Sequence, residues 1–175
     1  MKKFIFATTL AVCVFLCFPV KAEIYLSGAF GYSDNKSDIV QPGVLKIDNM
    51  KNAPVYAFAS GYEMPFFRAE AEYFSMNVKD KEGFGLDKRL KAGMVNAYLT
   101  VPFIGVYGGV GTGYAKLAGK KEQLYQAMAG WEFGVPKAAF GIEYRRTQSG
   151  KDFKNNNTEL KFKADSLMLK MRFSF

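Results

Sequence analysis

Apolar and polar residues alternate with a period of two along most of the chain. In the first run, Ile24, Leu26, Gly28, Phe30 and Tyr32 alternate with mostly small or polar residues. Such alternation is typical of strands with one apolar face, and no heptad or amphipathic-helix pattern interrupts it after residue 22. It predicts eight strands, at 24–33, 54–63, 67–77, 91–101, 105–115, 124–134, 138–148 and 163–175.

The connections between these runs alternate in length. Tight connections at 64–66, 102–104 and 135–137 each contain a proline, whereas longer polar segments occupy 34–52, 78–90, 116–123 and 149–162. Short turns at one end and long loops at the other predict an all-β fold, an eight-stranded antiparallel up-and-down transmembrane β-barrel. A sheet in lipid has no open edge, so the eighth strand is expected to pair with the first.

The alternation also predicts which face of each strand meets lipid. The outward apolar set comprises Leu26, Phe30, Ala127, Trp131, Phe133, Phe140, Ile142, Tyr144, Leu167, Leu169, Met171, Phe173 and Phe175. The second strand is ambiguous, because Val55, Ala57 and Ala59 compete with Tyr56, Phe58 and Tyr62. We place its larger aromatic residues outside, since an eight-stranded interior has room only for modest side chains.

Charged residues fall on the opposite, inward face. The predicted network inside the barrel comprises Arg68, Glu70, Glu72, Glu132, Glu143, Arg145, Lys170 and Arg172. A charge facing lipid near the midplane costs roughly 2–4 kcal/mol, whereas a charge facing a narrow interior finds an opposite partner. The network is therefore either an ion path or a salt-bridged plug, and we favour the plug. Glu63 and Arg68 flank the first tight turn on one face and are expected to pair locally.

Residues 1–22 have the composition of a cleaved signal peptide. Lys2 and Lys3 precede an apolar run, and Val20-Lys21-Ala22 supplies a cleavage-like site. Acylation at Cys13 or Cys17 is the weaker alternative, because Val12 and Leu16 stand where a small residue is needed. Cleavage removes both cysteines and three lysines, which lowers the 24 basic residues to 21 against 16 acidic ones, or +5.

The composition excludes several kinds of chemistry. The chain has no histidine, and residues 23–175 have no cysteine, so histidine-dependent triads, thiol nucleophiles and histidine–metal sites are impossible. Glu70 and Glu72 share one face, as paired catalytic carboxylates do, but ion pairing is the better interpretation. We therefore predict no enzymatic activity, no cofactor and no metal site.

The polar segments carry basic clusters expected at the cell surface. They include Lys79, Lys81, Lys88, Arg89, Lys120 and Lys121. Outward-facing loops would bring these residues to lipopolysaccharide phosphates or to polyanions of another cell, and simple solubility is an equally good interpretation. Nucleic acid is a poor partner, because the basic residues lie on separate loops rather than along one stripe.

Several segments together resemble a known family. They are the leader, FRAEAEY at 67–73, NAY at 96–98, VYGGVGTGYA at 106–115, GIEYR at 141–145 and LMLKMRFSF at 167–175. The chain resembles the small eight-stranded outer-membrane barrels of Gram-negative bacteria, which include the OmpA transmembrane domain, OmpX/Ail and opacity-type porin-like proteins.

The resemblance implies insertion by the outer-membrane assembly machinery. The assembly signal would be the terminal pattern Leu167, Leu169, Met171, Phe173 and Phe175. We therefore expect a barrel domain at 23–175 in the cell outer membrane, with an envelope-structural, adhesin or surface-antigen role. A narrow porin-like channel and a soluble periplasmic lipocalin-like barrel are the alternatives, and a host or cell-surface ligand is a further expected partner.

Overall fold

The computed structural model describes residues 22–41, 44–49, 53–78, 88–117, 120–135, 137–150, 153–155 and 158–175. The predicted signal peptide, apart from Ala22, lies outside these ranges, as do Lys79 and Lys81. Among the described residues all regular structure is strand, and no helix there is long and apolar enough to cross a membrane.

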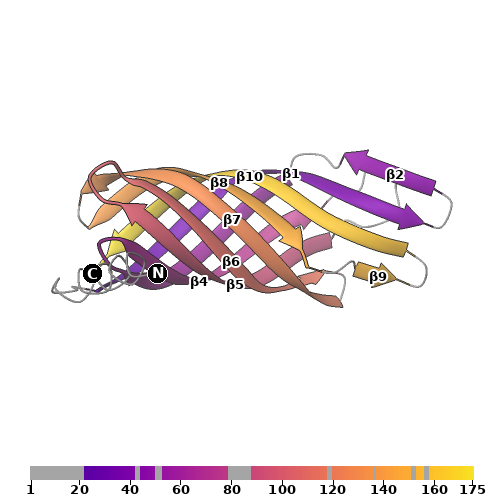
Figure 1. The fold of residues 1–175 in the computed structure, drawn as a ribbon, viewed down its shortest axis with the longest axis horizontal. Coiled ribbons are helices and arrows are strands. Elements are labelled where there is room, and N and C mark those ends of the chain that lie inside the picture. The colour runs from indigo at the N-terminus through magenta and orange to yellow at the C-terminus, as the bar shows by residue number, and fades with distance from the viewer. Residues whose placement is uncertain are drawn as a thin grey trace, which may run out of the picture.

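Eight long antiparallel strands form a closed barrel (Figure 1). They are β1 (Glu23–Gln41), β3 (Ala53–Glu63), β4 (Phe67–Val78), β5 (Lys88–Val101), β6 (Val106–Leu117), β7 (Lys120–Val135), β8 (Ala138–Ser149) and β10 (Thr158–Ser174). Each pairs with the next, and β10 pairs with β1 from Tyr25↔Ser174 to Val40↔Glu159. Each of these eight strands is therefore paired on both sides, and the predicted fold class is confirmed.

The two ends of the barrel differ. β1 begins and β10 ends at the end with the tight turns, as Figure 1 shows. There, the backbone N–H and C=O groups of Met64 and Phe67 form two hydrogen bonds across the first turn. In the second turn, Gly105 has φ +71°, and an added Cβ would collide with the Glu132 carbonyl, so only glycine fits.

At the opposite, loop end the strands continue beyond their predicted limits. β1 extends to Gln41 and pairs with β2 (Val44–Asn49), while β9 (Phe153–Asn155) pairs with β10. The predicted loop at 116–123 is mostly strand as well. These segments lack clean apolar alternation, so the sequence predicted loops where backbone pairing in fact continues.

The two faces of the wall have the predicted character. Every member of the predicted outward set is exposed on the exterior. In the ambiguous strand β3, Tyr56, Phe58 and Tyr62 point outward, while Val55 and Ala59 are buried inside. The placement was right but its reason was wrong, because the interior also holds large aromatic side chains, among them Tyr25 and Tyr98.

The interior has two layers. Toward the loop end it is an apolar cluster that was not predicted from the sequence. Its members include Phe74, Met76, Leu90, Leu124 and Phe162. Toward the tight turns it is polar and charged. The strands therefore position a buried network of ions beneath an apolar cap.

Candidate functional site

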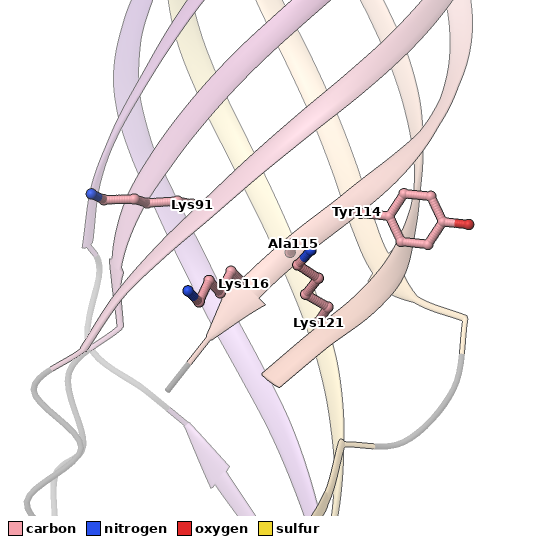
Figure 2. A pocket seen from close by; sticks show the side chains of 5 residues that line it. All are labelled: Lys91, Tyr114, Ala115, Lys116 and Lys121. Atoms are coloured by element: carbon pink, nitrogen blue, oxygen red, sulfur yellow. The ribbon is translucent and has the colours of Figure 1, made fainter. Parts of the chain in front are cut away.

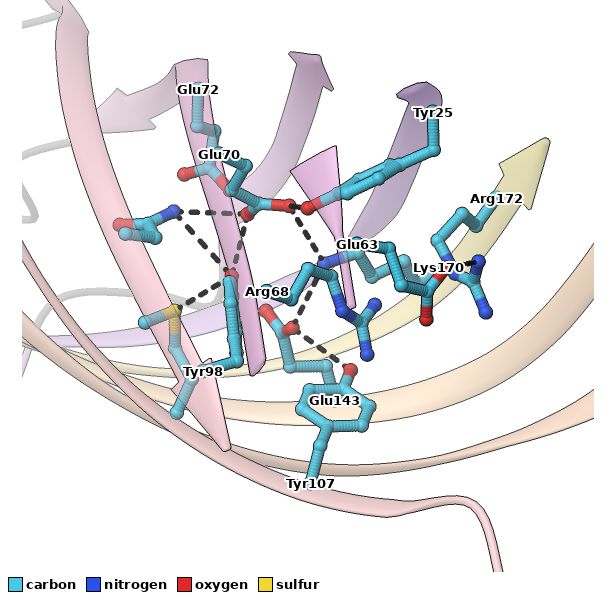
Figure 3. A network of polar contacts seen from close by, with 12 residues as sticks. Tyr25, Glu63, Arg68, Glu70, Glu72, Tyr98, Tyr107, Glu143, Lys170 and Arg172 are labelled. Atoms are coloured by element: carbon cyan, nitrogen blue, oxygen red, sulfur yellow. Dashed lines mark hydrogen bonds and ion pairs between the residues drawn. The ribbon is translucent and has the colours of Figure 1, made fainter. Parts of the chain in front are cut away.

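The eight charged residues predicted to line the interior all lie inside the barrel. β4 supplies Arg68, Glu70 and Glu72, β7 supplies Glu132, β8 supplies Glu143 and Arg145, and β10 supplies Lys170 and Arg172. Most are named in Figure 3, where side chains from several strands converge. Spacing by two along each strand places them on one face, and closure of the sheet brings the strands together.

Arg145 lies between two carboxylates. Its Nη1 and Nη2 donate to the two oxygens of Glu72 at 2.5 and 2.7 Å. Its Nε and Nη2 donate to Oε1 of Glu143 at 3.1 and 2.6 Å. The planar guanidinium suits this fork-like geometry, and both carboxylates are fully buried with it. The three side chains form one ion-pair cluster across β4 and β8.

Lys170 connects that cluster to Glu70. Its Nζ lies 3.4 Å from Oε2 of Glu143 and 3.5 Å from Oε2 of Glu70. Glu70 also accepts hydrogen bonds from Tyr25 Oη at 2.7 Å, Tyr98 Oη at 2.6 Å and Asn96 Nδ2 at 3.0 Å. Each oxygen of the Glu70 carboxylate therefore has several donors, which compensates its burial.

A second chain of ion pairs lies nearer the tight turns. Arg68 Nη1 donates to Glu132 Oε1 at 2.8 Å, and Glu132 Oε2 accepts from Arg172 Nε at 3.1 Å. Arg172 also pairs with Glu63. The predicted local pair of Glu63 with Arg68 is therefore wrong, because in a narrow barrel the long Arg68 side chain reaches β7 on the far wall.

Aromatic rings complete the network, and their part in it was not predicted from the sequence. Arg68 lies over the rings of Tyr25, Tyr98 and Tyr107 at 4.9 to 5.8 Å. Tyr107 donates to Glu143 Oε2 at 2.9 Å. The sequence could have placed these tyrosines on the inward face, since Tyr25, for example, alternates with Ile24 and Leu26. Their partners could not be predicted, because they lie on distant strands.

The charged side chains of the predicted network are paired with one another. The four predicted carboxylates face four predicted cations, and each carboxylate is engaged in an ion pair. Only Arg68 Nε and Gln126 Oε1 are buried without a partner in the part of the chain that the structure describes. No group of three or more potential metal ligands occurs among those residues. Chemically, the network is a set of satisfied ion pairs.

The other predicted site residues lie on the outside. Leu167, Leu169, Met171 and Phe173 form an exterior stripe on β10, with Phe175 exposed beyond its end. Arg89 and Lys121 are exposed near the loop end, and Arg89 Nε donates to Asn77 Oδ1 at 3.3 Å. Lys88 and Lys120 begin β5 and β7.

The fold is a small closed antiparallel barrel of eight strands. Among solved structures, the chain is similar to Neisserial surface protein A (NspA), with 14% identity, a TM-score of 0.60 and coverage of 88% of this chain and 99% of that one. Two structures of Ail from Yersinia pestis are also similar.

The Ail structure in complex with the heparin analogue sucrose octasulfate shows 18% identity and a TM-score of 0.46, and the other shows 19% and 0.44. Each covers 87% of this chain and 99% of that one. No family model and no curated protein sequence matches the chain. At these identities the likeness is one of fold.

Proposed function

We propose that this chain is a non-enzymatic integral outer-membrane protein that displays loops at the cell surface, in an envelope-structural or adhesin and surface-antigen role. The observation that carries the proposal is the exterior of the closed barrel. Val95, Leu99, Val110 and Leu167 are each 60–69% exposed there. A continuous apolar band of this kind is suited to lipid and would aggregate in water.

The interior argues against the soluble alternative. A lipocalin-like barrel needs an apolar cavity for its ligand and a polar outer surface. Here the polarity is reversed, since Arg145, Glu143 and Lys170 are buried inside while Phe140 and Ile142 are exposed outside. We therefore favour a bilayer over the periplasmic fluid.

The packed interior also argues against the alternative of a narrow porin-like channel. Arg68, Arg145, Glu143 and Lys170 are at most 3% exposed, and the apolar cluster above them includes Leu90 and Leu124 at 0%. Eight strands enclose little more than side chains. The observations favour a sealed barrel in which the charges stabilise the wall.

Four partners follow from this proposal. The exterior contacts outer-membrane lipid, and the basic residues near the loop end contact lipopolysaccharide phosphates. The assembly machinery recognises the alternating segment from Leu167 to Phe175. A host or cell-surface ligand would bind the loops. Removal of residues 79–87 should reduce attachment to host cells if the role is adhesion, and unchanged attachment would favour an envelope-structural role.

Envelope fractionation tests the proposal. We expect the protein in the outer-membrane fraction, with faster migration in SDS before boiling than after, because a closed barrel resists the detergent until heated. Phe173→Ala should lower the amount assembled if the terminal stripe is the assembly signal. Recovery in the soluble periplasmic fraction, without a heat-dependent shift, would contradict the proposal.

A further inference from the structure

The second tight turn, between β5 and β6, holds an aromatic residue in a strained backbone conformation. The side chain of Phe103 in this turn is fully exposed. Among the described residues, Phe103 is the only one other than glycine with a positive φ, which is +77°. A bulky residue adopts this left-handed region only at a cost in strain, whereas glycine or asparagine adopts it more easily. The strained turn thus presents a phenylalanine ring that no described part of the chain buries.

Hydrogen bonds hold this turn and its neighbour in place. Trp131 Nε1 of β7 donates to the Ile104 carbonyl at 2.7 Å. The backbone N–H of Thr100 in β5 donates to the Phe66 carbonyl at 3.0 Å, which ties β5 to the first tight turn. The backbone that carries Phe103 is therefore held in position before the ring meets a partner, and this lowers the entropic cost of burying the ring.

The hairpin of β5 and β6 has charged residues only at its loop end. There, Lys91 and Lys116 lie opposite each other on the exterior, beside the hollow of about 340 Å³ drawn in Figure 2. The chain from 92 to 115 has no charged residue. The third tight turn differs, because it carries the exposed Lys137. The second tight turn therefore lacks the charge that would keep it on the water side of a membrane.

The length of the hairpin matches the thickness of a membrane core. Phe103 comes 12 residues after Lys91, which is roughly 40 Å along an extended chain. Strands of transmembrane barrels are tilted by about 35–45°, so the two residues lie roughly 28–33 Å apart along the barrel axis. The hydrocarbon core of a bilayer is about 30 Å thick. With Lys91 at the level of the outer headgroups, Phe103 reaches the opposite boundary of this core.

We propose that the second tight turn inserts into the inner leaflet of the outer membrane, with the Phe103 ring among the upper acyl chains of its phospholipids. This assignment rests on the proposed membrane location. The exposed residues Val101 and Val106 connect the turn to the apolar outer wall, so lipid covers the wall and the ring together. Burial of the ring offsets the strain in the turn. Since Lys137 stays among the headgroups, the barrel leans with its β5–β6 side deeper.

Site-directed spin labelling tests the depth of the turn. Residues 23–175 contain no cysteine, so Phe103→Cys and Lys137→Cys each introduce a single site, the second serving as the matched control in the third tight turn. Each variant is labelled with a nitroxide and refolded into phospholipid nanodiscs, which leave both membrane faces open to solvent. We expect the label at residue 103 to collide more with oxygen than with a water-soluble nickel chelate. The label at residue 137 should show the reverse.

The unfolding equilibrium in bilayers tests the ring itself. Phe103→Asn accepts the positive φ but removes the ring. It should lower the ratio of folded to unfolded protein about fivefold or more if lipid buries the ring. Phe103→Leu, which keeps an apolar side chain, should largely preserve that ratio. If the ring has no partner in the membrane, Phe103→Asn should instead raise the ratio, because it relieves the strain without losing any burial.

Three outcomes would overturn the assignment. They are greater collision of the label at residue 103 with the nickel chelate, a higher folded ratio in Phe103→Asn, and dipolar broadening between labels at residue 103, which would assign the turn to a contact with a second copy. Migration before and after boiling is measured for every variant. An intact heat shift with a water-exposed label contradicts the inserted turn alone, whereas absence of the shift from the unaltered protein contradicts the proposed function as well.

Discussion

Adjacent arginines on β8 experience opposite environments. Arg145 is buried and bonded to Glu72 and Glu143, whereas the side chain of Arg146 is 62% exposed and pairs with Asp165 on the exterior. Removing one partner of a buried ion pair leaves an uncompensated charge in a medium that solvates it poorly. An exposed pair loses little, because water and lipid headgroups replace the partner.

This contrast yields a matched pair of substitutions. Arg145→Gln should lower the free energy of unfolding by about 3–5 kcal/mol, because it strands the Glu72 carboxylate. Arg146→Gln should lower it by no more than about 1 kcal/mol. Urea titration of the protein refolded into lipid vesicles measures both. Equal losses would show that the interior network does not stabilise the barrel.

Two neighbouring glycines of β6, Gly108 and Gly109, also differ in their surroundings. A Cβ on Gly109 would collide with the ring of Tyr98, which is held by its hydrogen bond to Glu70. A Cβ on Gly108 would have its nearest contact at 3.8 Å, from the Met128 carbonyl oxygen. The small residue at 109 thus provides the space that the interior tyrosine occupies.

We expect Gly109→Ala to lower the free energy of unfolding by about 1–3 kcal/mol, since neither the ring nor the backbone yields easily. Gly108→Ala should be neutral or stabilising by up to about 1 kcal/mol, because alanine is less costly to order than glycine. The temperature at which unboiled samples lose their fast migration reports both effects. A lower temperature for Gly108→Ala than for Gly109→Ala would refute the packing argument.

At the scale of the strand, the position of an exterior residue along the barrel axis determines how much a charge there destabilises the barrel. Val110 lies near the middle of β6 and is 66% exposed, whereas Gln123 of β7 lies toward the loop end. Val110→Arg should destabilise the barrel in vesicles by about 2–4 kcal/mol, and Gln123→Arg by no more than about 1 kcal/mol. Equal tolerance of the two arginines in urea titrations would mean that β6 does not face lipid.

The sequence predicted the strands well where one face is apolar. Period-two alternation located the barrel strands and the exterior positions of Trp131, Phe140 and Leu169, because burial of one face imposes that pattern. The prediction failed beyond residue 33 in β1 and before Lys91 in β5, where the strands continue as paired backbone with polar residues. Backbone hydrogen bonds alone leave no such signature.

The partners inside the barrel were beyond sequence reasoning. The period-two alternation placed Glu72 and Arg145 on the inward face. Their contact, however, joins residues 73 positions apart and depends on how the sheet closes. The same geometry sends Arg68 to Glu132 rather than to the adjacent Glu63. The apolar cap was missed because Phe74 follows the charged residues Glu70 and Glu72 on its strand face, and because Leu90 fell within the predicted loop 78–90.

At the scale of the whole molecule, the layered interior determines permeability. The ion pairs fill the half near the tight turns, and the apolar cluster fills the half near the loops. We expect no sustained ion conductance when the purified protein is added to planar bilayers, because ions would have to cross a dry apolar layer. Steady currents that change in Lys170→Gln would instead establish the porin-like alternative.

The central claim is that the exterior of this barrel contacts lipid. The fluorescence of the single tryptophan tests this claim without any substitution. Trp131 is 52% exposed on β7 near the tight turns, and its Nε1 donates to the Ile104 carbonyl at 2.7 Å. After refolding into vesicles, its fluorescence should be quenched by phospholipids brominated near the headgroup more than by those brominated near the chain ends. Aqueous iodide should quench it weakly. Strong quenching by iodide with none by brominated lipid would contradict the account.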